Sequence, residues 1–463
     1  MERRIWKSLG VVLAVAVAAC DVPRPTAPAM PPSAPGLSAS RSHGGDDADT
    51  LVRSVRLLAA AHGITPLPRP PHVPAAMVRL GRALAFDRIL SGNRDIACMT
   101  CHSVEYGSDD GKSLGIGQGG IGVGPSRTHP DGVFLPRNVP SLFNLFGMKH
   151  LFWDGRVEVD AQAHFHTPAG AQLTPAMERV LQYGPVSALG MFPVVNRTEM
   201  RGNGGNELAA LGEDDYTGVW DGIMKRLGRI PEYRAMFEAA YPGTRFSRMN
   251  FAYASNAIGG FLIDRLTMNR SPWDSFLAGD DDALSRRQLE GAQTFLTLKC
   301  SQCHNGPTFS DQQFHDVAVA QIGPGEGDGA GGRDDFGRFR VTGNPDDRYR
   351  FRTTPLRNVE LTGPYGHDGA IVDLRDFIAH YSQSDLKLLS YDPGQLEPLL
   401  QSTMLHNELD VNARRDTLIV GVVLTDDLVN KLVDYMSALT DPRARNLSGL
   451  APRRVPSGLP VDR

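Results

Sequence analysis

Two five-residue stretches decide the fold of this 463-residue chain: CMTCH at residues 98–102 and CSQCH at residues 300–304. Each is a C-x-x-C-H motif, in which two thiols can form thioethers with a porphyrin and the next histidine can bind its iron. A redox C-x-x-C pair or half of a zinc site is the alternative, but neither needs a trailing histidine in two complete copies. The sequence therefore predicts two covalent c-type haems, held by Cys98, Cys101, His102, Cys300, Cys303 and His304.

Each motif follows a segment with apolar residues at helical spacing. These residues are Met77, Leu80 and Leu84 before the first motif and Leu289, Ala292 and Leu296 before the second. A further helix is predicted over about residues 426–439, because acidic residues occupy its first turn and leucines recur on one side. The pattern favours a mainly α fold with two tandem class I cytochrome c-like haem domains, long loops and insertions.

The first twenty residues have the pattern of an export signal. Three basic residues precede a short apolar run, residues 9–19, which is too short to span a bilayer as a helix. The run ends at Cys20 in a sequence that resembles a bacterial lipobox. We therefore expect residues 1–20 to be a signal peptide, and Cys20 to anchor a periplasmic lipoprotein to a membrane through lipid. A plain signal peptide cleaved near Ala19 is the alternative.

The amino-acid composition limits the possible partners and indicates how the rest of the chain is organised. The chain has 48 basic and 52 acidic residues, so no basic excess indicates a nucleic-acid partner. Residues 21–48 are rich in proline and poor in apolar side chains, which predicts a flexible tether. We expect an N-terminal haem domain over residues 49–284, a C-terminal haem domain over residues 285–445 and a disordered tail over residues 446–463.

Several short blocks stand in a fixed order around the two haem motifs. They are LSGN at 90–93, RNVPSL at 137–142, FWDGR at 152–156, EM at 199–200, PLRNV at 355–359 and PYGHDG at 364–369. Over about residues 75–440 the chain thereby resembles the bacterial di-haem cytochrome c peroxidase and MauG family. The resemblance implies a haem peroxidase in which the haem on His102 is the peroxide site and the haem on His304 transfers electrons.

The resemblance implies catalytic roles for three residues. Trp153 corresponds to a tryptophan between the haems that relays oxidising equivalents, although a tryptophan is more often part of a core. Glu199 corresponds to a distal glutamate, which can move a proton between the two oxygens of peroxide. Pro193 resembles a distal-pocket proline of MauG-type members. The segment before Pro193 is longer than usual, and we expect His164 and His166 within it to lie on the surface or in a pocket wall.

The resemblance also implies a calcium ion between the domains. Asn138 and the backbone carbonyls of Thr362 and Pro364 correspond to its protein ligands, and these are the hard oxygen atoms that calcium prefers. A turn asparagine beside a proline loop is the alternative for Asn138.

The sixth ligand of the C-terminal iron distinguishes two branches of this family. Peroxidases place a methionine 14 residues after the histidine of the H-D-G block, and this chain has Tyr381 there. An anionic phenolate stabilises ferric and higher-valent iron more than a thioether does. Tyr381 therefore favours the MauG-like branch, in which both haems share oxidising equivalents. Met404, Met436 and His380 are the alternative ligands.

The sixth ligand of the N-terminal iron distinguishes an iron that is open to peroxide from one that must first lose a protein ligand. Peroxidases of the family that need reductive activation carry a removable distal histidine, for which the candidate here is His129, in a glycine-rich stretch. We expect His129 to be a loop residue that leaves the iron open to peroxide. A non-catalytic di-haem electron carrier would need strong protein ligands on both irons, and Glu199 would then have no role.

Together these features predict an exported oxidoreductase that reduces hydrogen peroxide at the haem on His102. Its partner would be a small electron-donor protein, a cytochrome c or a cupredoxin, or a protein substrate that is itself oxidised. The sequence leaves the oligomeric state open, a homodimer included. One or two of the arginines over residues 333–357 are expected to pair with haem propionates, whereas the glycine-rich loop over residues 323–332 lacks the context of a phosphate site.

Overall fold

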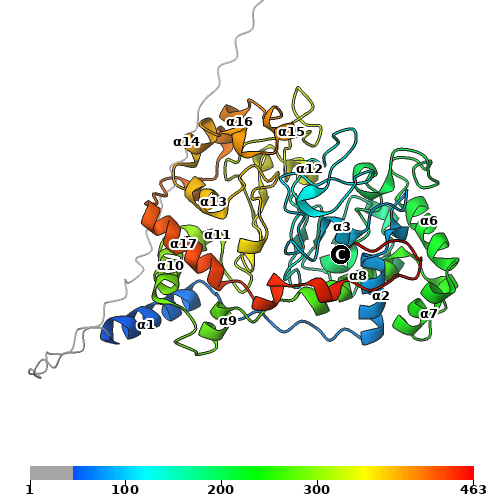
Figure 1. Ribbon diagram of the computed structural model, residues 1–463, viewed down its shortest axis with the longest axis horizontal. Coiled ribbons are helices and arrows are strands. Elements are labelled where there is room, and N and C mark those ends of the chain that lie inside the picture. Colours follow the sequence, from blue (N-terminus) through cyan, green and yellow to red (C-terminus); the bar gives the residue numbers. More distant parts are fainter. Residues whose placement is uncertain (1–44, 463) are drawn as a thin grey trace, which may run out of the picture. The chain divides into compact units, whose positions relative to one another are not determined.

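The structure is a computed structural model that describes residues 45–462 (Figure 1). The expected signal peptide, the lipidated Cys20 and nearly all of the tether lie outside these residues. Within the described part, no helix has the length and apolar character needed to cross a membrane.

The fold is mainly helical, which confirms the predicted class. The helices of the first part are α1 (Gly45–Ala61), α2 (Ala75–Ala85), α3 (Cys98–Cys101), α4 (Pro175–Glu178), α5 (Pro185–Leu189), α6 (Tyr216–Gly228), α7 (Pro231–Ala240), α8 (Phe251–Leu266) and α9 (Pro272–Leu277). Those of the second part are α10 (Arg286–Thr297), α11 (Cys300–Cys303), α12 (Phe339–Thr342), α13 (Leu374–His380), α14 (Ser384–Leu389), α15 (Pro398–Gln401), α16 (Glu408–Arg414) and α17 (Asp426–Ala438). Both C-x-x-C-H motifs thus form one short helical turn each, with the histidine at its end.

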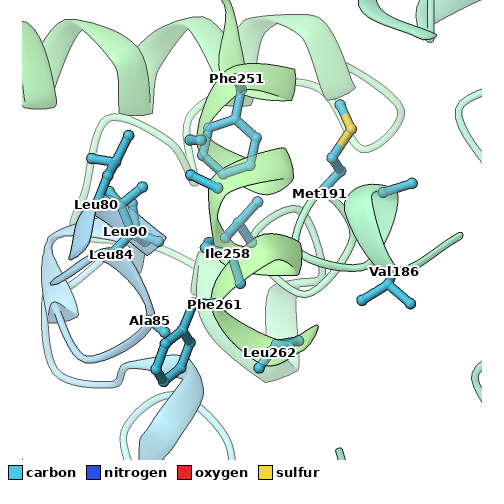
Figure 2. Close-up of a cluster of buried hydrophobic side chains, with 14 of the residues drawn as sticks. Leu80, Leu84, Ala85, Leu90, Val186, Met191, Phe251, Ile258, Phe261 and Leu262 are labelled. Carbon is cyan, nitrogen blue, oxygen red and sulfur yellow. The ribbon is translucent and has the colours of Figure 1, made fainter. Parts of the chain in front are cut away.

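The first hydrophobic core surrounds α2 and α8. All three residues of the predicted apolar face of α2, Met77, Leu80 and Leu84, are buried. Figure 2 shows Leu80 and Leu84 on the side of α2 that meets α8, with Val186 of α5 beyond α8. The haem motif of α3 follows α2 and joins this core through Met99.

Glycines let one pair of helices approach closely in each half of the chain. A Cβ atom on Gly81 of α2 would lie 1.9 Å from the backbone oxygen of Ala257 in α8. A Cβ atom on Gly291 of α10 would lie at the same distance from the backbone oxygen of Lys431 in α17. Any larger residue would push the helices apart, so both haem motifs adjoin a tightly crossed helix pair.

The second hydrophobic core surrounds α10 and α17 and includes a segment from the beginning of the chain. Val55 and Ala59 of α1 are buried there, together with Trp273 of α9. The predicted boundary assigned α1 and α9 to the N-terminal domain. The structure places them differently because the apolar side of α1 packs against α10 (Figure 1).

The C-terminal segment, residues 446–462, packs onto the first core. The prediction of a disordered tail is wrong for residues 446–462: Val455 is fully buried, and Ser457 Oγ donates a hydrogen bond of 2.6 Å to the carboxylate of Asp87. Asp462 pairs with Arg88 and accepts a hydrogen bond from Thr100, inside the first haem motif. Buried polar groups of the first half need these partners, which a composition-based argument cannot show.

Two small antiparallel sheets hold residues through which the two halves of the chain make contact. Strands β1 (His150–Leu151), β2 (Val157–Val159) and β3 (Phe165–His166) form one sheet, and the turn between β1 and β2 carries the FWDGR block. Strands β4 (Phe314–His315) and β5 (Phe351–Arg352) form the other. The backbone N–H of Arg352 donates to the carbonyl of Trp153 at 2.9 Å, which joins the two halves directly.

Candidate active site and haem cavities

The first C-x-x-C-H motif opens into a cavity with an empty volume of about 1300 Å³, its mouth included. Cys98, Cys101 and His102 line it. Nδ1 of His102 lies 3.1 Å from the carbonyl oxygen of Ser108, and because a carbonyl only accepts, this nitrogen carries the proton. Burial lowers the pKa of His102 to about 4. The ring is therefore neutral, with Nε2 free to bind a metal.

Glu199 and Pro193 line the same cavity. Glu199 stands on a short π-helical turn, Arg197–Arg201, whose start is fixed because the side chain of Asn196 accepts the backbone N–H groups of Thr198 and Glu199. One carboxylate oxygen of Glu199, Oε2, is buried without a hydrogen-bond partner among the described residues. Burial is the main cause of a raised pKa at this carboxyl, which favours its protonated form.

Charged groups around Glu199 act in opposite directions. Arg156, which also lines the cavity, lowers the pKa of Glu199, whereas the carboxylate of Glu326 raises it. Arg137 and Asp154 make smaller, opposed contributions. The net effect remains an upward shift, because desolvation outweighs the charges.

Sequence reasoning missed Glu326 as part of this cavity. It belongs to the glycine-rich loop of the second half, for which the sequence suggested no role. Gly325 has a φ of +61°, and a Cβ atom there would lie 1.8 Å from the carbonyl oxygen of Arg333, so the loop closes in a form that only glycine allows. Glu326 lies 3.4 Å from Nε of Arg137. The glycine spacing signals a tight loop, but only the fold shows which cavity it reaches.

The second C-x-x-C-H motif opens into a cavity with an empty volume of about 1440 Å³, its mouth included. Cys300, Cys303 and His304 line it. Nδ1 of His304 donates to the carbonyl of Phe309 at 3.0 Å, so that Nε2 is again the free nitrogen. Burial lowers the pKa of His304, as it does for the first histidine.

Tyr381 also lines the second cavity, and burial raises the pKa of its phenol. A phenolate there would need a cation such as ferric iron beside it. Of the alternative ligands, Met436 lines the cavity and Met404 does not. Nε2 of His380 instead donates to the carbonyl of Val317 at 2.8 Å, and His380 is not among the described residues that line the cavity.

Trp153 and Arg352 line both cavities. The indole N–H of Trp153 donates to the carbonyl of Asn138 at 2.8 Å, which fixes the ring between the two halves. The sequence predicted a tryptophan between the haems, and the structure places it in the wall that the two cavities share.

Three further histidines lie apart from both cavities. His129 is half-buried in its loop, where Nδ1 accepts the backbone N–H of Asp131 at 3.1 Å, and it is not among the described residues that line the first cavity. His164 and His166 have mainly exposed side chains that pair with Asp160. All three are thus loop or surface residues here.

Of the expected calcium ligands, Asn138 belongs to the first half of the chain, and Thr362 and Pro364 belong to the second. Nδ2 of Asn138 donates to the carbonyl of Lys112 at 3.0 Å, so its side-chain oxygen points away from that carbonyl. The backbone N–H of Asn138 donates to the carbonyl of His367, close in sequence to Thr362 and Pro364.

Comparison with known proteins relates this arrangement to a family. Residues 75–282 match the family described as di-haem cytochrome c peroxidase. The chain is 32% identical over 309 residues to cytochrome c551 peroxidase of Pseudomonas aeruginosa, which covers 66% of this chain and 72% of that protein. The chain belongs to the di-haem cytochrome c peroxidase family. It is thus an oxidoreductase of the haem peroxidase type, as its sequence predicted.

The chain is also similar to a MauG protein and to a solved di-haem peroxidase structure. The methylamine utilization protein MauG of Methylorubrum extorquens is 26% identical over 341 residues, which cover 73% of this chain and 75% of that protein. The solved structure of the di-haem peroxidase BthA from Burkholderia thailandensis covers 85% of this chain and 91% of its own, with a TM-score of 0.55 and 19% identity. That structure supports the fold alone.

Two covalent haems c are the cofactors that the di-haem cytochrome c peroxidase family implies, and the residues of both cavities fit them. Each cavity presents two thiols and a neutral histidine whose Nδ1 proton is fixed by a backbone carbonyl. That is the arrangement in which Nε2 binds iron while the second ring nitrogen is held by hydrogen bonding. Glu199, with its unpartnered Oε2, lines the same cavity as the first haem motif.

Proposed function

We propose that this peroxidase is MauG-like: hydrogen peroxide is cleaved in the cavity of His102, and oxidising equivalents are shared with a C-terminal haem held by His304 and Tyr381. The observation that carries the proposal is a tyrosine, rather than a methionine, at the expected ligand position in the second cavity. When bound, the two haems supply the iron that reacts with peroxide and exchanges electrons.

The chain itself supplies the proton transfer. The unpartnered Oε2 of Glu199 can take a proton from one peroxide oxygen and return it to the other. Burial raises its pKa, which makes the carboxyl a stronger base for the first transfer than an exposed glutamate. His129 lies in its own loop, which supports an N-terminal iron that is open to peroxide without prior reduction.

Trp153 links the two sites in this proposal. We expect Trp153→Phe to keep the reaction of peroxide at the first haem but to slow oxidation of the second by at least about tenfold, or about 1.4 kcal/mol of barrier. Rapid-mixing spectroscopy of the holoprotein follows both haems. Trp220→Phe is the matched control, because that indole is buried in the first core and lines neither cavity. Equal rates in Trp153→Phe and wild type would exclude the relay.

Calcium is the second cofactor that we propose, held by the side chain of Asn138 and the carbonyls of Thr362 and Pro364. A ligand that binds only the folded state stabilises it, by about 2.7 kcal/mol at one hundred times its Kd. We expect excess calcium to raise the Tm of the holoprotein and a chelator to lower it, and Asn138→Ala to abolish this difference. If the wild-type Tm is the same with calcium and with chelator, no structural calcium is bound.

The reductant and the location follow from the same reading. We propose that electrons come from a small electron-donor protein or from a residue of a protein substrate that is oxidised in the process. We also propose that this peroxidase is periplasmic and is anchored to a membrane through lipid on Cys20. The basic and apolar pattern of residues 1–20 supports export, and two covalent haem motifs are typical of exported cytochromes.

A further inference from the structure

Arg352 of β5 is a buried cation where the two halves of the chain meet. The residue as a whole is only 5% exposed. Nε donates to the carbonyl of Phe152 at 3.2 Å, and Nη1 is buried with no hydrogen-bond partner among the described residues. No carboxylate of the described residues forms an ion pair with it. Burial lowers the pKa of Arg352 to about 10, and the nearby carboxylate of Asp154 offsets only part of that effect.

A neighbouring buried arginine is paired in a different way. Arg137 is buried in the same junction, and its guanidinium contacts both Asp154 and Asp335 at 2.6 Å. A buried charge left unpaired strongly destabilises a folded protein. A fold that satisfies Arg137 fully and leaves Nη1 of Arg352 free therefore points to an anion that the polypeptide does not supply.

The position of Arg352 identifies the source of that anion. Arg352 lines both haem cavities, a property that it shares with Trp153. Each haem brings two propionate carboxylates, and a planar guanidinium with several free N–H donors can bind more than one carboxylate oxygen.

We propose that Arg352 is the common partner of propionate groups from the two haems. This side chain would carry a positive charge close to both porphyrins. Separately, the backbone N–H of Arg352 donates to the carbonyl of Trp153 and so holds the two residues side by side. A positive charge beside a haem favours the reduced, less positive iron. Arg352 therefore raises the reduction potentials of both haems, and the inference is independent of how peroxide is cleaved.

Potentiometric titration of the holoprotein tests this role. Arg352→Met removes the charge with similar bulk, and we expect it to lower the midpoint potentials of both haems. Arg348→Met is the matched control: Arg348 lies in the same segment, pairs with Asp410 and lines neither cavity, so both potentials should stay at their wild-type values. Haem content, measured as the pyridine haemochrome, shows that both haems are attached. A shift at one haem only, or at neither, overturns the proposal.

A second variant tests whether Arg352 binds the propionates if Arg352→Met fails to acquire both haems. Arg352→Lys keeps the charge but replaces the planar fork by a single ammonium. We expect its potentials to stay closer to wild type, while the propionate bending bands of both haems shift in the resonance Raman spectrum. Unchanged bands at either haem would show that Arg352 does not bind the propionates of both.

Discussion

Glu199→Gln is expected to slow the reaction of hydrogen peroxide with the oxidised protein by about 10²–10⁴-fold, the usual contribution of a positioned acid–base group. Glutamine keeps the size of the side chain and can still lie on the Arg197–Arg201 turn, but it cannot take up and return a proton. The measurement is the rate of the absorbance change after rapid mixing of the holoprotein with peroxide. Haem content and absorption spectra before mixing should match the wild type.

The pH dependence of that rate is a further part of the same prediction. A base must be deprotonated to accept the first proton, so the rate should rise with pH through the pKa of Glu199. Because burial raises this pKa, the rise should lie above the ordinary value of about 4.3 for a glutamate. In Glu199→Gln the rise should be absent.

Glu105→Gln is the control, since Glu105 is exposed and lines neither cavity. Its rate and pH profile should equal those of the wild type. A Glu199→Gln protein that reacts as fast as the wild type, with the same pH profile, would show that another group moves the proton. Glu326, the second carboxylate of the cavity, would then be the next residue to replace.

Tyr381→Phe is expected to change the C-terminal haem more than any other single substitution outside the attachment motifs. Loss of an anionic oxygen ligand should raise the reduction potential of this haem by on the order of 0.1 V or more, because axial ligands span roughly 0.8 V. The variant should also lose the ability to keep oxidising equivalents on both haems. Spectroelectrochemistry and electron paramagnetic resonance of the holoprotein measure the potential and the ligand set.

Tyr391→Phe is the matched control, because Tyr391 donates its O–H to the carbonyl of Ala370 and does not line the cavity. If Tyr381→Phe leaves the potential and the spectrum unchanged, tyrosine is not the ligand. Met436, the alternative sulfur ligand that lines the same cavity, would then be tested by Met436→Leu.

Local sequence patterns were sufficient to predict the helical class and the haem motifs. The apolar faces of α2 and α10 follow from residue spacing, and every residue predicted for these two faces is buried. The thiols and histidines of the two motifs were equally clear, because covalent attachment requires neighbours in the sequence.

Local sequence patterns could not predict contacts between segments that are far apart in the chain. The helix α1 packs on the second core and the tail, residues 446–462, on the first, since the partners of Val55 and Asp462 lie in the other part of the chain. Glu326 and Arg352 show the same limit for the site. A glutamate in a glycine-rich loop and one arginine among many carry no local signal, and only their burial against the cavities distinguishes them.

One measurement tests the central claim most directly: one equivalent of hydrogen peroxide is added to the fully oxidised holoprotein without reductant, and visible and near-infrared spectra are recorded. The MauG-like account predicts a rapid change to a long-lived oxidised state that involves both haems. A response that appears only after one haem has been reduced would contradict it and indicate a cytochrome c peroxidase that needs reductive activation. No response in either state would leave a di-haem electron carrier.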